Sequence, residues 1–393
     1  MKQPSGARVL IAGGAVAALE AVLTMQELAD GPLQITLLAP GRYFEYTPLS
    51  VAEPFDLGRA HRFELAELLR ERGVEVIEDA LESVDAERRE VRTAAGATLP
   101  YAALLLAIGA GRRSALPGAI TFSGARTSSD VRRLLREAEQ GTLRRLIFAV
   151  PPGVTWSLPA YELALMTSAH LAERDVSTSV SIVTPEPRPV DAFGARASGA
   201  VGEMLALRGI AFHTATALRV EGGQLILEHG EPIPAEAVVA LPRLLAPQIA
   251  GLPGDEEGFI PVDEYGRVRG LGAVYAAGDA TSFPLKQGGI ATQQADAAAA
   301  AIAAELGFAV SPTPFRPVLR GLLLTGRAPR YLRAEVLSGG ATRSSAEEEA
   351  IWWPPAKIAG RRLGPFLALQ GVSGGAPPDA VALELEASGE GPG

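Results

Sequence analysis

The chain has 393 residues, a hydrophobic content of 47% and a charged content of 21%, which is typical of a globular protein of two or three domains and excludes a disordered one. Its formal net charge of −9 excludes a basic field that would attract nucleic acid. It has no cysteine and only four scattered histidines. Disulfides, thiolate nucleophiles and cysteine-bound metals are therefore excluded, and we expect no metal site.

The first residues show no apolar run ahead of a cleavage site, and no apolar stretch reaches the length of about 18 residues that a membrane span needs. We therefore expect a cytoplasmic protein that does not span a membrane.

The beginning of the chain has the pattern of a dinucleotide-binding fold. Residues 7–13 form an apolar run that ends in glycine, residues 16–29 have helical spacing, and residues 34–39 form a second apolar run. Strand, tight turn, helix and strand in this order make a βαβ unit. A helix over 62–72 is expected next, followed by strands and a closing apolar run over 74–79, 81–85, 89–94, 97–101 and 104–111.

A second block repeats this pattern, which indicates an internal duplication of the fold. We expect helices over 129–140, 159–173 and 195–208, and strands over 145–150, 179–184, 210–214 and 237–241. The chain then returns to the first domain with a strand and turn over 274–281 and a long helix over 288–306.

The predicted fold class is α/β, with two Rossmann-like domains, the second inserted in the first, and a small C-terminal region. The expected boundaries are 1–118 and 246–310 for the first domain, 119–245 for the second, 311–386 for the C-terminal domain and 387–393 for a flexible tail.

Two loops carry the candidate cofactor site. In the first, Gly13 holds the turn position of a GxGxxG fingerprint, whereas Ala15 and Ala18 replace its other glycines. In the second, Gly278-Asp279 ends a strand just ahead of a helix, where backbone amides and the helix dipole favour a phosphate and the carboxylate accepts a ribityl hydroxyl. Either loop alone also fits a turn that binds no nucleotide; together they favour a flavin.

These features identify a resemblance to flavoproteins with two dinucleotide-binding domains, nearest to the branch of sulfide:quinone oxidoreductases and type II NADH dehydrogenases. The resembling segments lie in family order over residues 7–310 and are 9–21, 39–49, 104–110, 158–165 and 274–289. The resemblance implies FAD as cofactor.

It also implies the residues around that cofactor. The pyrophosphate would lie on Gly13, Gly14, Ala15, Val16 and Ala17, the adenosine near Pro40 and Arg42, and the flavin ring near Thr47, Pro48, Ala107, Ile108, Gly109, Gly278, Asp279, Lys286, Gln287 and Gly288. Ala39 stands where the family often has the acid for the ribose, and Ile108 where it usually has threonine.

Two of the implied positions are candidate catalytic residues. Lys286 is one of only three lysines in a chain whose other basic residues are arginines, and an ammonium beside the flavin stabilises the negative charge of its reduced form. Glu162 aligns with a helix glutamate near the flavin, where it would relay protons to or from a substrate. The alternative for Lys286 is a surface lysine ahead of a helix, and the alternative for Glu162 is a solvent-facing or capping carboxylate.

The second domain departs from an NADH-binding loop. Residues 151–159 read PPGVTWSLP, and three prolines and a tryptophan do not give the close amide cradle of GxGxxG. The sulfide:quinone branch also lacks a standard loop here, but it has a catalytic cysteine in this neighbourhood. Because this chain has none, polysulfide chemistry through a disulfide is excluded.

The C-terminal segment 351–369 combines aromatic, apolar and basic residues. In the relatives this region docks on the membrane and admits quinone, so peripheral contact with the inner membrane surface is one expectation. The alternative is a domain or dimer interface that covers the flavin, and a homodimer is therefore a further expectation.

We therefore expect an FAD-dependent oxidoreductase that transfers electrons directly through the flavin between a small donor and an acceptor, for which quinone is a candidate. One alternative is an NAD(P)H dehydrogenase of the quinone type, with Glu186 contacting the ribose. The other is a catalytically silent flavin-binding protein that serves as a redox sensor or partner subunit.

Overall fold

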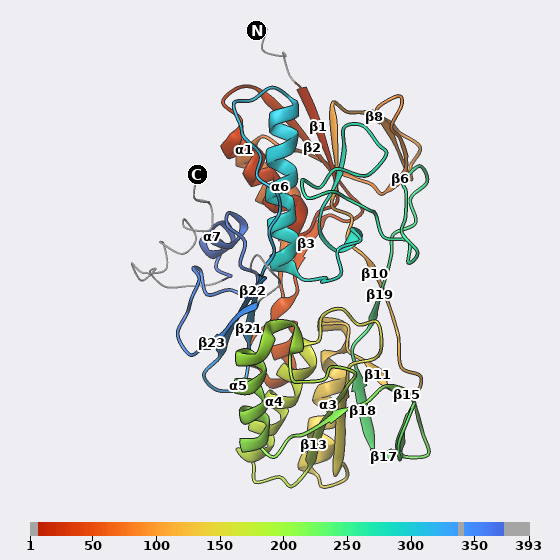
Figure 1. The fold of residues 1–393 in the computed structure, drawn as a ribbon, viewed down its shortest axis with the longest axis vertical. Coiled ribbons are helices and arrows are strands. Elements are labelled where there is room, and N and C mark those ends of the chain that lie inside the picture. Colours follow the sequence, from red (N-terminus) through yellow and green to blue (C-terminus); the bar gives the residue numbers. More distant parts are fainter. Residues whose placement is uncertain (1–6, 337–341, 373–393) are drawn as a thin grey trace.

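The computed structural model describes residues 7–336 and 342–372. It has two α/β halves, one above the other, with the C-terminal part beside both (Figure 1). In the upper half a parallel sheet has the strand order β20-β9-β1-β2-β5. Its strands are Val274–Ala276, Ala103–Leu106, Ala7–Ala12, Leu33–Ala39 and Glu75–Glu78.

The alternation of side chains along β1 explains how this sheet is covered. Val9 and Ile11 face helices α1 (Val16–Leu28) and α6 (Gly288–Glu305), which pack side by side (Figure 1). Leu10 and Ala12 point to the opposite face. An antiparallel sheet covers that face with β6, β7 and β8, which span Leu81–Asp85, Glu90–Thr93 and Thr98–Pro100.

The lower half repeats the parallel sheet, with the strand order β11-β18-β12-β13-β14. Its strands are Ile120–Thr121, Ala237–Ala240, Arg145–Ala149, Ser179–Thr184 and Ala211–Thr214. Phe148 packs with the helices on one face, and Ile147 with an antiparallel sheet on the other. The helices are α3 (Ser128–Glu139), α4 (Leu158–Ala172) and α5 (Gly194–Leu207), and the sheet consists of β15 (Ala217–Glu221), β16 (Gln224–Leu227) and β17 (Ile233–Pro234).

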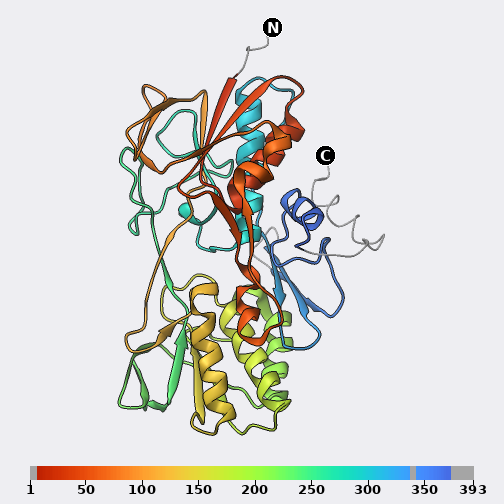
Figure 2. The same ribbon diagram turned by 180° about the vertical axis from the view of Figure 1, so that it is seen from behind.

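Because β20 returns to the first sheet after the whole second half, the second Rossmann-like domain is inserted in the first, as predicted. The chain crosses between the halves in two antiparallel strands, β10 (Gly111–Arg113) and β19 (Arg243–Leu245), which are seen from behind in Figure 2. The exact boundaries at 118, 245 and 310 stay a prediction.

The C-terminal part forms an antiparallel sheet that the sequence did not predict. It has the order β21-β22-β23, with bounds Val318–Leu323, Arg330–Val336 and Thr342–Glu347, followed by helix α7 (Leu363–Leu369). It contacts α4 and α5 of the lower half and α6 and α1 of the upper half. The predicted boundary at 386 and the tail 387–393 lie outside the described residues.

The predicted helix over 62–72 is wrong over its first residues. Residues His61–Glu64 form strand β4, which pairs with β3 (Tyr43–Tyr46), and Phe63 stacks on Phe44 with 6.2 Å between ring centroids. Cross-strand packing overrides helical spacing here. Helix α2 begins only at Leu65 and ends at Leu68, and a 3-10 turn follows over Arg70–Arg72.

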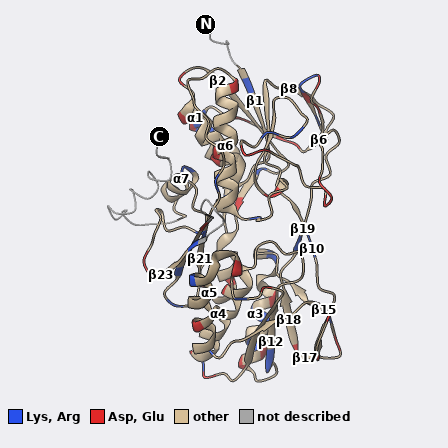
Figure 3. Ribbon diagram, in the orientation of Figure 1, with Lys and Arg blue, Asp and Glu red and all other residues tan. Residues whose placement is uncertain are grey.

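Acidic and basic residues are interspersed over both halves in the view of Figure 3. In the part of the chain that the structure describes, no helix is long and apolar enough to cross a membrane.

Candidate functional site

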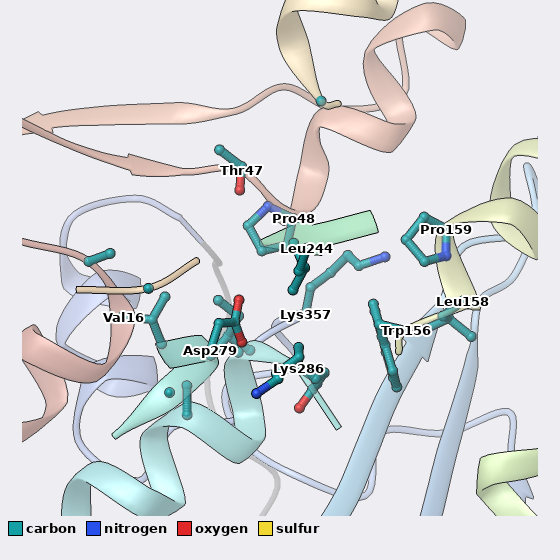
Figure 4. A pocket seen from close by; sticks show the side chains of 18 of the residues that line it. Val16, Thr47, Pro48, Trp156, Leu158, Pro159, Leu244, Asp279, Lys286 and Lys357 are labelled. Carbon is teal, nitrogen blue, oxygen red and sulfur yellow. The ribbon is translucent and has the colours of Figure 1, made fainter. Parts of the chain in front are cut away.

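A cavity of about 360 Å³ lies where the two halves and the C-terminal part meet, within the size range of small-molecule sites. In Figure 4, Asp279 and Lys286 lie on one side of it and Trp156 and Pro159 on the other, with Lys357 between them. The sequence-predicted residues that line it are Ala15, Val16, Ala17, Thr47, Pro48, Ala107, Gly109, Glu162, Gly278, Asp279, Lys286, Gln287 and Gly288.

The N-terminus of α1 opens onto this cavity. Its N-cap residue, Ala15, makes no side-chain capping bond, and the first turn has no acidic residue. The first amides of the helix therefore have no partner from a capping side chain, and the positive end of the helix dipole favours an anion there. Ala15, which replaces the second glycine of GxGxxG, is exposed and lines the cavity.

Gly13 and Gly14 shape this loop from behind and are not among the lining residues. Gly13 has φ +124°, and a Cβ there would lie 2.1 Å from the carbonyl oxygen of Ala107. A Cβ on Gly14 would lie 2.7 Å from Leu65 and 2.9 Å from Ala39. Both positions therefore exclude side chains because neighbouring segments approach so closely.

Three other predicted cofactor residues also lie off the cavity wall. Pro40 and Arg42 are exposed, and the Arg42 guanidinium donates to Glu64 at 2.8 Å. Ile108 packs against the core of the first domain. Its neighbour Gly109 has φ +66° and lines the cavity, so the backbone turn expected at this position is present.

Asp279 and Lys286 form the polar part of the wall after β20. Burial raises the pKa of Asp279, while Lys286 and Arg112 lower it. Within the described residues no group donates a hydrogen bond to the Asp279 carboxylate. The Asp279 side chain is half-buried and lines the cavity, so its carboxylate can accept hydrogen bonds from a ligand that brings hydroxyl groups.

Lys286 is buried, which rules out the alternative of a surface lysine. Its ammonium donates to the carbonyl of Thr281 and lies 3.8 Å from the centre of the Phe259 ring. Burial lowers the pKa of Lys286 to about 8, against the opposing effect of Asp279. The lysine therefore brings a positive charge to the cavity wall at neutral pH.

Gln287 caps helix α6 instead of pointing a free amide at the cavity. Its side-chain oxygen accepts from Ile290 N at 2.8 Å, and its Nε2 donates to the carbonyl of Arg320 at 3.0 Å. Next to it, Gly288 leaves room for Ile358, since a Cβ there would lie 2.7 Å from that side chain. These contacts fix the start of α6 against the C-terminal part.

Glu162 is fully buried and forms an ion pair with Lys357, which overturns the alternative of a solvent-facing or capping carboxylate. Its Oε1 also accepts from Leu324 N at 2.9 Å, whereas its Oε2 has no partner in the described part of the chain. Burial raises the pKa of Glu162, and Lys357 opposes that rise. Burial likewise lowers the pKa of Lys357.

Lys357 is the main site residue that the sequence reasoning did not place. It belongs to the segment 351–369, for which membrane contact and a domain or dimer interface were both expectations, and it lines the cavity beside Glu162. The only signal in the sequence was the rarity of lysine. Glu45 and Arg112 also line the cavity and were not predicted.

Much of the segment 351–369 packs inward. Trp352 is 1% exposed and donates from its indole to the carbonyl of Ala356 at 3.0 Å. Arg362 donates to Glu27 and Asp296 on helices α1 and α6. This segment therefore forms the domain contact over the cavity that was the alternative expectation. Membrane contact stays a prediction, for which Arg361 and Leu369 are the exposed residues.

Comparison with known proteins bears on this arrangement. The family described as pyridine nucleotide-disulphide oxidoreductase matches residues 7–303. The chain belongs to this family. As a member of the pyridine nucleotide-disulphide oxidoreductases it has the family's two Rossmann-like domains, and its lack of cysteine sets it apart from the disulphide chemistry in the family's description.

The curated relatives include a sulfide-quinone reductase and an NADH dehydrogenase-like protein, in agreement with the predicted resemblance. A sulfide-quinone reductase of Aquifex aeolicus is 27% identical over 268 residues, which are 63% of this chain and 61% of that protein. An NADH dehydrogenase-like protein of Mycobacterium tuberculosis is 29% identical over 233 residues, or 56% of this chain and 58% of that protein. Each match therefore spans less than two thirds of the relative.

Solved structures confirm the fold. The sulfide:quinone oxidoreductase of Aquifex aeolicus has a TM-score of 0.79 at 20% identity, with 87% of each chain covered. A ferredoxin reductase of Rhodopseudomonas palustris has a TM-score of 0.63 at 21% identity and covers 85% of this chain and 83% of its own.

No cluster of potential metal ligands occurs within residues 7–336 and 342–372.

Proposed function

We propose that this protein binds FAD in the cavity and transfers electrons directly between the flavin and small molecules, with a quinone as acceptor. The observation that carries the proposal is the convergence of three features on one cavity. These are the start of α1 without a side-chain cap, the Asp279 carboxylate, which accepts no hydrogen bond from the described residues, and the buried pair Glu162–Lys357. Family membership supports the cofactor, and the name of the Aquifex relative supports the acceptor.

The residues fit distinct parts of FAD. The amides of Ala15, Val16 and Ala17 suit the pyrophosphate, and Asp279 suits a ribityl hydroxyl. FAD would supply the electron-accepting ring, which the chain's own side chains cannot replace. Lys286 would hold positive charge at that ring.

Glu162 and Lys357 would serve the substrate that exchanges electrons with the flavin. Reduction of a quinone to a quinol takes up two electrons and two protons. A carboxyl group with a raised pKa beside an ammonium group is suited to hand on a proton. The orphan Oε2 of Glu162 is the atom at which such a proton would be held.

Replacing Lys286 with methionine is expected to lower the flavin midpoint potential by on the order of 30 mV, or about 1.4 kcal/mol for two electrons, because the charge that stabilises reduced flavin is lost. The difference in flavin midpoint potential between wild type and variant should become smaller above pH 8, where Lys286 itself loses its proton. Spectroelectrochemistry over a pH series measures this difference. Lys286→Arg, which keeps the charge, is the control; equal potentials in wild type and Lys286→Met would contradict the role.

Replacing Glu162 with glutamine is expected to lower turnover by about hundredfold, because glutamine cannot exchange a proton. It should also remove an ionisation from the pH profile of turnover while leaving the flavin spectrum intact. Steady-state rates with a soluble quinone across a pH series measure both effects. A pH profile that keeps the wild-type shape in the variant would exclude the proton role.

A donor screen by anaerobic stopped flow tests the proposed function against its alternatives. Direct transfer predicts fast bleaching of the flavin by some small donors, with slow reduction by NADH and NADPH. Fast bleaching by either nucleotide would favour the NAD(P)H dehydrogenase. Slow reduction by every donor, with FAD retained, would favour the silent redox sensor or partner subunit. Cytoplasmic location and a homodimer remain predictions.

A further inference from the structure

The loop that follows β12 in the second domain stands where a nucleotide would lie on a Rossmann fold. The corresponding loop of the first domain leaves the amides at the start of α1 uncapped. In the second domain the loop instead forms a hydrogen bond with a carboxylate that follows the next strand. That carboxylate belongs to Glu186, which follows β13 and is the residue an NAD(P)H dehydrogenase would use for the ribose.

Both oxygens of Glu186 are engaged by the protein itself. Oε1 accepts from the hydroxyl of Ser157 at 2.9 Å. Oε2 accepts from the hydroxyl of Tyr161 at 2.7 Å and from that of Thr184 at 3.2 Å. Tyr161 is fully buried, so a ribose that displaced it from Glu186 would leave its O–H without the carboxylate acceptor. The Glu186 carboxylate is therefore already occupied by hydrogen bonds within the protein and is not available to a ribose.

The same bonds position Trp156, the residue next to Ser157. The indole of Trp156 packs on the ring of Phe193, with 5.7 Å between centroids and 56° between planes. Phe193 in turn lies against β21, where a Cβ on Gly321 would be 2.5 Å from its ring. Trp156 is thus held between a fixed loop and a fixed ring, and it lines the cavity (Figure 4).

The wall around Trp156 is mostly apolar. Its apolar lining residues from the second domain and the neighbouring crossing strand are Val154, Leu158, Pro159, Leu241, Pro242 and Leu244, beside the polar Ser123 and Thr155. The nearby cation of the C-terminal part, Lys357, is already paired with Glu162. An aromatic face beside apolar side chains favours a flat, uncharged ring, whereas the phosphates of a dinucleotide would find no amide cradle here.

We infer that the loop after β12 in the second domain forms part of the substrate site. In this loop Trp156 binds an uncharged planar ring, and Glu186 is the positioning residue that holds the loop in place. The inference rests on the proposed function for the flavin that this ring would face. It assigns to the second domain a ring-binding role in place of dinucleotide binding.

The test compares two ligands that share the dihydronicotinamide ring, of which only one also carries the phosphates and the adenosine of a dinucleotide. Holoprotein whose flavin has been reduced with dithionite is titrated anaerobically with N-benzyl-1,4-dihydronicotinamide or with NADH, so that no electron transfer accompanies binding. Quenching of tryptophan emission reports both ligands, with Trp352 and Trp353 as remaining reporters when Trp156 is replaced. We expect the benzyl compound to bind about tenfold more tightly than NADH.

Variants separate the roles of the two residues. Trp156→Ala is expected to weaken binding of the benzyl compound about tenfold, and Trp156→Phe to keep most of the affinity because an aromatic face remains. Tyr161→Phe and Ser157→Ala, which free Glu186 without touching Trp156, should weaken the benzyl compound and strengthen NADH.

Tighter binding of NADH than of the benzyl compound by the wild type would overturn the inference. An affinity for the benzyl compound that is unchanged in Trp156→Ala would also overturn it. Because every titration uses protein whose flavin spectrum has been recorded first, failure of ring binding leaves the proposed flavin function standing. Absence of the flavin is a separate failure that concerns the proposed function alone.

Discussion

Replacing Gly13 with alanine is expected to destabilise the protein by about 4 kcal/mol or more and to abolish FAD binding. The added Cβ would lie 2.1 Å from the carbonyl oxygen of Ala107, and φ +124° is a backbone conformation that alanine rarely adopts. Either β1 or β9 must shift to relieve the contact, and with it the start of α1. Chemical denaturation and the flavin absorbance of the purified variant measure the two effects.

Gly73 provides the matched control. It also has a positive φ, of +63°, but a Cβ there would meet nothing within 4 Å. Gly73→Ala should therefore cost only about 1 kcal/mol, from backbone conformation alone. If Gly13→Ala and Gly73→Ala were equally stable and both retained FAD, the close approach at Gly13 would have no energetic importance.

Replacing Lys357 with methionine is expected to cost about 3–5 kcal/mol, because it leaves the buried carboxyl group of Glu162 without its counter-charge. Since burial raises the pKa of Glu162 in the folded state above the 4.5 of the unfolded chain, the folded variant binds the proton more tightly. Its stability should therefore fall as the pH rises above 4.5. Urea denaturation over a pH series measures this.

Two further variants decide whether the ion pair is the cause. The double variant Glu162→Gln/Lys357→Met removes both charges and should recover most of the lost stability. Arg361→Met removes an exposed cation from the same segment and should change the stability by less than about 0.5 kcal/mol. A double variant as unstable as Lys357→Met would assign the loss to packing instead of charge.

Local patterns predicted most of the cavity wall where we propose that FAD binds. The turn at Gly13, the Gly278–Asp279 turn and the helix after Lys286 each lie within one βα unit, where sequence neighbours are also spatial neighbours. The parallel sheets followed from runs of buried residues such as those of β1 and β12. A short-range pattern sufficed for these elements.

The part of the cavity that we propose for the substrate depends on contacts between distant segments, and the sequence predicted little of it. Glu162 and Lys357 are 195 residues apart in the sequence, so no spacing relates them, and no pattern in the sequence paired Lys357 with Glu162. The engagement of Glu186 by Ser157 and Tyr161 depends on the conformation of a proline-rich loop. The hairpin of β3 and β4 likewise replaced part of a predicted helix through cross-strand packing.

The most direct test of the central claim is the absorbance spectrum of the purified protein, before and after incubation with FAD and removal of the unbound cofactor. We expect an oxidised flavin spectrum at a ratio of about one FAD per chain, released as FAD on denaturation. Gly13→Ala should show little flavin under the same treatment. A colourless wild-type protein that takes up no FAD would contradict the account.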